Sequence, residues 1–262
     1  MSTVELHHDI QGEGPPLLLI AGLGLSSGAW ATVAPALAQS YTVITVDNRG
    51  TGRSPVPEGP YTIDGMADDI AALLRSLDLG PVSAVGWSLG GSLLQSLLIN
   101  HGELIDKAVL LNAFPSYTKV QDAWLDAGLI LRQSGLEPAA LAVQGLAWAL
   151  TPRALTNHEA LYETQRMAAE MDPHPTSYEG YAGQAAGLRV YDSREQLPTV
   201  TNKVLVLAGA EDTLTPPWQS VEMAELIPNA HLQILPRGNH GMILEYPDDT
   251  LAAITAFLSR PA

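Results

Sequence analysis

The stretch Val82-Ser83-Ala84-Val85-Gly86-Trp87-Ser88-Leu89-Gly90-Gly91 decides how this chain folds. Its first four residues are typical of a short buried strand, and leucines at helical spacing follow its end: Leu89, Leu93, Leu94, Leu97 and Leu98. Ser88 therefore falls where a strand turns sharply into a helix, the context in which a G-x-S-x-G sequence holds a serine hydroxyl out of the chain. The alternative is a glycine-rich connection in which Ser88 only caps the helix.

Composition limits the classes of protein to which the chain can belong. Its 262 residues are 46% hydrophobic, enough for one large domain with a substantial core. The balance of 13 Lys and Arg against 28 Asp and Glu gives a net charge of -15, which argues against nucleic acid and anionic membrane as partners. The start of the chain lacks the features of a signal peptide, and no apolar run is long enough to cross a bilayer. We expect a cytoplasmic protein, and the sequence leaves open whether it forms a homodimer.

Short apolar runs alternate with helical patterns along the chain, which predicts a mostly parallel sheet with helices on both faces. The candidate strands are Leu17 to Ala21, Val43 to Asp47, Val82 to Gly86, Ala108 to Asn112, Val204 to Ala208 and His231 to Leu235, with an edge strand at Val4 to Asp9. Helices are expected at Ile63 to Leu77 and at about Asp248 to Leu258.

One segment interrupts this alternation. Residues 114–197 show helical patterns broken by prolines and no convincing strand. We interpret them as a helical cap inserted into a core made of residues 1–113 and 198–262. An insertion between two core strands leaves the sheet at its carboxyl edge, where open α/β sheets bind their ligands. The cap is therefore expected to cover Ser88.

A serine at neutral pH is a poor nucleophile, so Ser88 predicts a histidine base and an acid that orients it. Asp212 follows the strand Val204 to Ala208, and His240 follows the last strand, which gives the chain order Ser, Asp, His. Asp212 would accept the Nδ1 hydrogen of His240, while Nε2 takes the proton of Ser88. Glu211 is the alternative acid, and Asp212 could instead be a turn residue.

The other histidines occupy poorer positions for a base. His7, His8, His101 and His231 lie on or beside expected strands and helices, and His158 and His174 lie in the insertion, from which they could face the substrate. No ligand spacing typical of a metal site occurs, and the chain has no cysteine, so we expect neither metal nor thiolate chemistry.

Acyl transfer also requires backbone N–H groups that stabilise the oxyanion. One donor is expected to be the amide of Leu89, at the start of the helix after Ser88. The second is expected in the turn Ala21-Gly22-Leu23-Gly24-Leu25, from the amide of Leu23. The glycines of this turn do not fit the pattern of a dinucleotide or phosphate loop.

Taken together, these motifs resemble those of α/β-hydrolases over nearly the whole chain. The matching runs are Gly86 to Gly91, Asp47-Asn48-Arg49-Gly50-Thr51-Gly52-Arg53-Ser54, Gly209 to Asp212 and Gly238-Asn239-His240. The resemblance implies Ser88, Asp212 and His240 as a triad, with Leu23 and Leu89 as oxyanion donors. One departure is Ala21-Gly22, where many members have His-Gly, so another group must support that turn.

Within the family, the region from Pro57 to the elbow is similar to 3-oxoadipate enol-lactonases and small carboxylesterases, which implies a cofactor-free serine hydrolase of a small ester or lactone. Trp87, Trp124 and Trp148 are candidate substrate-binding residues, although large apolar side chains in helices more often form core. Perhydrolase or lyase chemistry, or a ligand receptor derived from a hydrolase, are the alternatives. An aminopeptidase would need a cap carboxylate, for which Glu163, Glu170 and Glu179 are only nominees.

Overall fold

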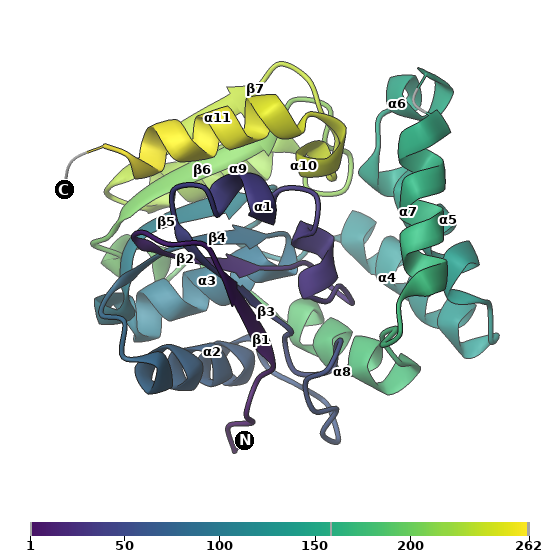
Figure 1. The fold of residues 1–262 in the computed structure, drawn as a ribbon, viewed down its shortest axis with the longest axis horizontal. Helices are drawn as coiled ribbons and strands as arrows, with labels where there is room; N and C mark the ends of the chain where they lie inside the picture. The colour runs from purple at the N-terminus through teal and green to yellow at the C-terminus, as the bar shows by residue number, and fades with distance from the viewer. Residues whose placement is uncertain (1, 158, 261–262) are drawn as a thin grey trace.

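The strand that leads to Ser88 lies at the centre of a seven-stranded sheet in the computed structural model, which describes residues 2–157 and 159–260 (Figure 1). The sheet order is β1-β3-β2-β4-β5-β6-β7, with β1 antiparallel to β3 and the other pairs parallel. The strands are β1 (His8–Gln11), β2 (Pro16–Ile20), β3 (Thr42–Val46), β4 (Val82–Trp87), β5 (Ile105–Leu111), β6 (Lys203–Gly209) and β7 (Ala230–Leu235).

Helices cover both faces of this sheet. Successive side chains of a strand point to opposite faces, so one strand contributes to two hydrophobic layers. Leu17 and Leu19 of β2 pack in one layer with α1 (Ala34–Leu37) and α11 (Pro247–Leu258). Leu18 and Ile20 pack in the other with α2 (Ile63–Leu77), α3 (Leu89–Asn100) and α9 (Pro217–Leu226). The near-continuous apolar strands of the sequence are therefore explained by burial on both sides.

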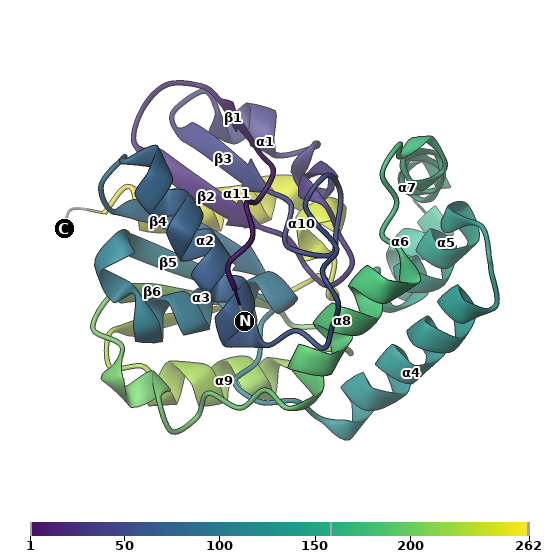
Figure 2. The ribbon, with the colours of Figure 1, turned by 90° about the horizontal axis from the view of Figure 1, so that it is seen from below.

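The segment between β5 and β6 is helical. It contains α4 (Lys119–Gln133), α5 (Pro138–Ala149), α6 (Pro152–Asn157), α7 (Glu159–Met171) and α8 (Tyr178–Arg189). In two perpendicular views, α4 to α7 stand away from the helices that flank the sheet (Figures 1 and 2). An antiparallel bridge between Ser116 and Asp192 joins the two ends of this insertion. The short helices η1 (Ser27–Trp30), η2 (Gly102–Leu104), η3 (Leu197–Thr199) and α10 (Met242–Glu245) complete the fold.

The expected edge strand at Val4 to Asp9 is wrong in its placement. The strand begins at His8 and runs to Gln11, so the expected and observed ranges share only His8 and Asp9. The amides of the preceding residues bond side chains: that of Val4 donates to Asp69, and that of His7 to Ser54. The His7 carbonyl oxygen accepts the Asp47 amide at 3.0 Å. By contrast, α2 has the expected limits, begun by Thr62, whose hydroxyl accepts the Gly65 amide.

No helix in the described part of the chain is both long and apolar enough to cross a lipid bilayer.

Candidate active site

Ser88 occupies the sharp turn between β4 and α3. Its backbone has φ 56° and ψ -117°, a conformation that residues other than glycine rarely adopt and that concentrates at functional sites. The turn requires glycine close by, because a Cβ on Gly90 would lie 2.1 Å from the carbonyl oxygen of Ile20. Ser88 is half-buried, whereas its neighbours Trp87 and Leu89 are buried. The elbow therefore presents the serine at the end of the strand, as the motif predicts.

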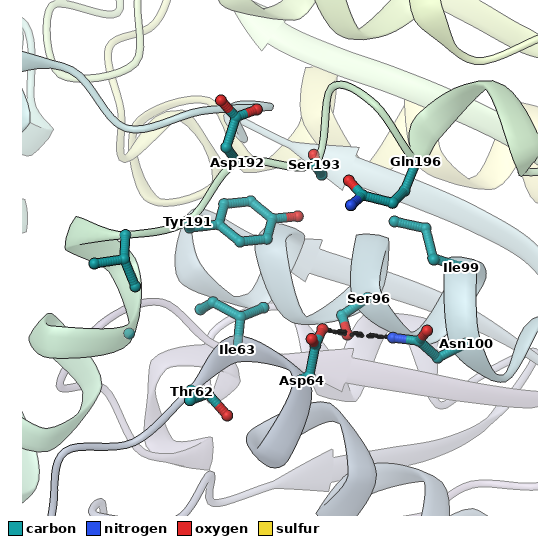
Figure 3. A pocket seen from close by; sticks show the side chains of 12 residues that line it. Thr62, Ile63, Asp64, Ser96, Ile99, Asn100, Tyr191, Asp192, Ser193 and Gln196 are labelled. Atoms are coloured by element: carbon teal, nitrogen blue, oxygen red, sulfur yellow. Dashed lines mark hydrogen bonds between the residues drawn. The ribbon is translucent and has the colours of Figure 1, made fainter.

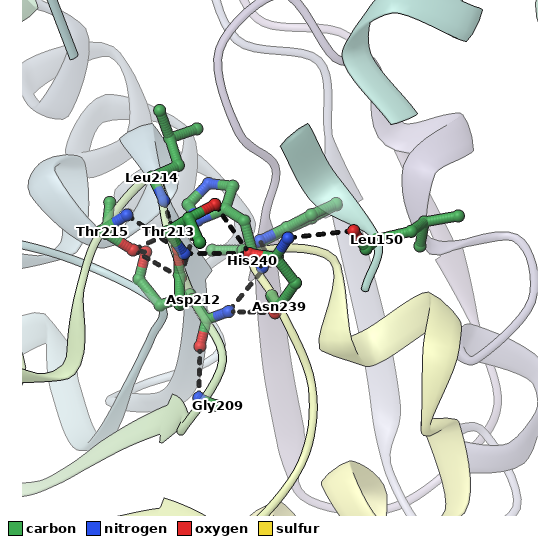
Figure 4. A network of polar contacts seen from close by, with 10 residues as sticks. Leu150, Gly209, Asp212, Thr213, Leu214, Thr215, Asn239 and His240 are labelled. Atoms are coloured by element: carbon green, nitrogen blue, oxygen red, sulfur yellow. Dashed lines mark hydrogen bonds and ion pairs between the residues drawn. The ribbon is translucent and has the colours of Figure 1, made fainter. Parts of the chain in front are cut away.

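Asp212 and His240 are brought together from the loops after β6 and β7. Asp212 Oδ2 lies 3.0 Å from His240 Nδ1, and the two side chains are almost completely buried (Figure 4). A carboxylate can only accept, so this bond places the ring proton on Nδ1 and leaves Nε2 able to take a proton. The pair has the orientation that a general base requires.

The Asp212 carboxylate is held by hydrogen bonds within its own loop. Oδ1 accepts the amides of Leu214 and Thr215 at 2.9 and 2.8 Å, and Oδ2 accepts the Thr215 hydroxyl at 2.7 Å. Glu211, the alternative acid, is exposed and accepts the Gly238 amide at 3.0 Å. The structure thus brings Asp212, and not Glu211, to the imidazole.

Asn112 and Trp87 fix the loop that carries His240. Asn112, directly after β5, donates to the carbonyl oxygens of Asn239 and His240 at 2.9 and 3.0 Å, and its own side-chain oxygen accepts the Gly209 amide. The Trp87 indole donates to the His240 carbonyl oxygen at 2.9 Å. One amide side chain thereby joins the ends of β5 and β6 to the histidine loop. Sequence reasoning missed Asn112, although it stands at the carboxyl end of an expected strand, where functional residues gather.

The expected oxyanion turn faces the serine. A Cβ on Gly22 would lie 3.4 Å from Ser88 Cβ, and Leu23 is the next residue along the chain. The amides of Leu23 and Leu89 have no acceptor among the described residues, 2–157 and 159–260.

The turn is supported by Gln184, which sequence reasoning also missed. Its side chain is completely buried, accepts the Gly24 amide at 2.9 Å and donates to the Arg49 carbonyl oxygen at 2.8 Å. Gln184 belongs to α8, so a helix of the insertion supplies the support that the Ala21-Gly22 departure called for. The sequence indicated only that Gln184 lies in a helical segment, and not which groups its side chain contacts.

The insertion also bonds the histidine loop. Asn239 donates its side-chain amide to the Leu150 carbonyl oxygen at 3.0 Å, as Figure 4 shows, and the Gly241 amide donates to Ala149 at 2.7 Å. The connection between α5 and α6 is therefore attached to the same loop that positions His240.

The three tryptophans lie in different surroundings. Trp87 is 4% exposed and packs edge-on against Trp30, with its indole N–H used by the histidine loop. Trp124 in α4 and Trp148 in α5 are half-buried. A substrate-binding role for the three tryptophans stays a prediction.

The other candidate side chains of the insertion lie in varied surroundings. His174 and Glu179 are exposed, and Glu163 pairs with Arg166. His158 and the side chain of Glu170 lie outside the described part of the chain.

Two cavities open elsewhere on the surface. One, of about 330 Å³, lies between the start of α2, α3 and the segment after α8, where Asp64 accepts hydrogen bonds from Ser96 and Asn100 (Figure 3). The other, of about 410 Å³, lies beside η1 and includes Arg53 and His174. Neither is lined by Ser88, Asp212 or His240.

Among the described residues, no group of three or more His, Asp or Glu side chains is arranged to hold a metal ion.

A model of the alpha/beta hydrolase fold family matches residues 15–247, most of the chain. The chain belongs to this family. Among the curated relatives of this alpha/beta hydrolase is RutD of Caulobacter sp. (strain K31), named as a carbamate hydrolase, which is 33% identical over 98% of this chain and 97% of its own. The 3-oxoadipate enol-lactonase 2 of Acinetobacter baylyi is 30% identical over 95% of this chain and 91% of its own.

Solved structures agree with the family assignment. The enol-lactonase from Burkholderia xenovorans LB400 superposes with a TM-score of 0.86 at 26% identity, covering 97% of this chain and 96% of its own. The fold predicted from the elbow and its alternating strands is confirmed, and the chain is an enzyme of a hydrolase family.

Proposed function

We propose that this enzyme is a serine hydrolase that cleaves a small carboxylic ester or lactone through an acyl-enzyme intermediate. The observation that carries the proposal is the buried contact of 3.0 Å between Asp212 and His240, at the same edge of the sheet as Ser88. The enol-lactonase relatives favour the substrate class. A carbamate is the second candidate, favoured by the name of RutD, and its carbonyl would be attacked in the same way.

The first half of the reaction forms a bond between Ser88 Oγ and the substrate carbonyl carbon. His240 Nε2 takes the serine proton, and the amides of Leu23 and Leu89 stabilise the negative charge on the carbonyl oxygen. When the tetrahedral intermediate collapses, the bond to the alcohol oxygen breaks, and that oxygen receives the proton from His240. In a lactone the alcohol remains part of the acyl group.

The second half releases the acid. His240 takes a proton from water, the resulting hydroxide attacks the acyl carbon, and the bond to Ser88 Oγ breaks as His240 returns the proton. The chain needs no cofactor for this sequence of steps. We propose that the insertion acts as a cap over the reacting groups, and its hydrogen bonds to the histidine loop and to the oxyanion turn support this.

Ser88→Ala tests the proposal. A panel of aryl esters, lactones and carbamates graded by size should lose turnover by on the order of a millionfold in this variant. Ser92→Ala is a matched control, because Ser92 lies one turn along α3 and its buried hydroxyl has no partner among the described residues. A fluorophosphonate probe should label the wild type and the control only. Labelling or turnover retained by a folded Ser88→Ala protein would overturn the proposal, and a product that appears only with added peroxide would favour perhydrolysis.

A further inference from the structure

Arg132, near the end of α4, lies beside the oxyanion turn. Its Nη2 atom is 3.6 Å from the position that a Cβ on Gly24 would take. Gly24 is two residues from Gly22, whose own Cβ position lies 3.4 Å from Ser88 Cβ, and two residues of chain span at most about 7 Å. The guanidinium and Ser88 therefore lie against the two ends of the same short turn.

The fold does not neutralise Arg132 as it neutralises other arginines. Arg49, Arg75 and Arg189 each pair with a carboxylate. Among the described residues, Arg132 has no ion pair, and its Nε atom is buried with no hydrogen-bond partner. A buried charged donor without a partner is costly, so such a group is a candidate for binding a ligand.

The surroundings of Arg132 stabilise its charge without cancelling it. The guanidinium lies 3.8 Å from the ring centre of Tyr181, in a cation–π contact, and it stands in the last turn of α4, where the helix dipole favours a cation. Burial lowers the pKa of Arg132, but an arginine remains protonated at neutral pH. In a chain of net charge -15, this is a local site for an anion.

A second donor lies on the same face of the helix. Trp124, Gly128 and Arg132 are four residues apart and therefore share one stripe of α4. Gly128 packs on Tyr181, since a Cβ there would lie 2.7 Å from the tyrosine hydroxyl. The indole Nε1 of Trp124 is buried and also has no partner among the described residues. Two unpartnered N–H groups thus lie on one stripe of α4, and that of Arg132 is beside the oxyanion turn.

We propose that Arg132 binds a carboxylate of the substrate, which makes the preferred substrate a small ester or lactone that carries one free carboxylate a few carbon atoms from the reacting carbonyl. This inference rests on the proposed hydrolase function and specifies its substrate class. The planar guanidinium can donate two parallel hydrogen bonds to a carboxylate, a geometry that a lysine ammonium does not reproduce.

Arg132→Met tests the subsite by specificity. The ratio of kcat/KM for mono(4-nitrophenyl) glutarate to that for 4-nitrophenyl pentanoate should fall about 10- to 100-fold, as expected when one charge-assisted interaction is lost. A second pair, 4-acetoxybenzoate and 4-acetoxybenzamide, places the carboxylate on the alcohol side. Arg132→Lys should recover part of the ratio. Arg75 belongs to α2 and pairs with Glu103, so Arg75→Met is the control and should leave the ratio unchanged. A ratio within twofold of the wild type in both pairs would overturn the proposal.

A binding measurement separates this proposal from the hydrolase mechanism. In the Ser88→Ala protein, which needs no turnover, monomethyl glutarate should bind at least tenfold more tightly than dimethyl glutarate in calorimetry. The preference should disappear when Arg132→Met is added. Equal binding of the two esters would sink the carboxylate subsite even if the wild type is an active esterase. If the wild type hydrolyses no ester but the preference persists, the reaction is wrong and the subsite stands.

Discussion

The loops at the carboxyl edge of the sheet and the inserted helices satisfy their polar groups to different degrees. Around Asp212 and His240, the carboxylate oxygens, the imidazole Nδ1 and the loop carbonyl oxygens have partners at 2.7 to 3.1 Å. On α4, the buried nitrogens of Gln121, Trp124 and Arg132 have none among the described residues. The comparison indicates that the loops of Asp212 and His240 are built for one fixed arrangement of reacting groups, whereas α4 leaves donors available for a ligand.

The largest effect expected from this comparison is on the triad. Asp212→Asn should lower kcat for an aryl ester by about 10⁴-fold, because the amide no longer holds the imidazole in the required tautomer. Glu211→Gln is the matched control at the neighbouring position and should stay within a fewfold of the wild type. Steady-state kinetics of the two variants measures the difference. Equal losses in both would mean that the Asp212 contact has no special role.

The next effect contrasts the stability of the two regions. Leu205 in β6 is completely buried, so Leu205→Ala should lower the free energy of unfolding by about 2 to 5 kcal/mol. Leu161 in α7 is only half-buried against the small cluster of Leu146, Leu150 and Ala154, and Leu161→Ala should cost about 1 kcal/mol. Urea unfolding of both variants measures the two values. A larger cost at Leu161 would contradict a loosely packed insertion.

A smaller effect is expected where the two regions meet. Gln184→Met keeps the side-chain volume but leaves the Gly24 amide and the Arg49 carbonyl oxygen without their partner, at a cost of about 1 to 3 kcal/mol. If the cost falls on the oxyanion turn, kcat should drop about 10-fold or more while KM changes little. An unchanged kcat with a lowered melting temperature would show that Gln184 supports only the fold.

The smallest effect is a pH dependence. Burial between the insertion and the oxyanion turn raises the pKa of Tyr181 to about 12, against about 10 for an ordinary tyrosine. Above pH about 10 the unfolded chain loses this proton first, so the stability that Tyr181 contributes is complete below that pH and is lost as pH rises toward about 12. Tyr181→Phe should reduce the slope of unfolding free energy against pH between about 10 and 12. Tyr178→Phe, on the exposed side of α8, is the control, and an equal slope in both variants would contradict the assignment.

The sequence alone was enough for the elements that depend on local pattern. A few neighbouring residues were sufficient to predict three features: the apolar strands β2, β4 and β6, the amphipathic helix α2, and the turn at Ser88. It misplaced β1, because strand pairing at an edge depends on which side chains reach the backbone. The cytoplasmic location, the homodimer and the absence of a nucleic-acid partner stay predictions.

Chain order alone determined Ser88, Asp212 and His240 as candidates, since the family motif fixes which strand each follows. Only the tertiary structure decided which groups hold them. The hydrogen-bond partners of Asn112, Thr215 and Gln184 lie 97, 25 and 160 positions away along the chain. Hydrogen bonds over such separations leave no periodicity in the sequence. The position of Arg132 beside Gly24 was likewise decided by how α4 packs on α8, because a helix pattern specifies a buried face but not what that face meets.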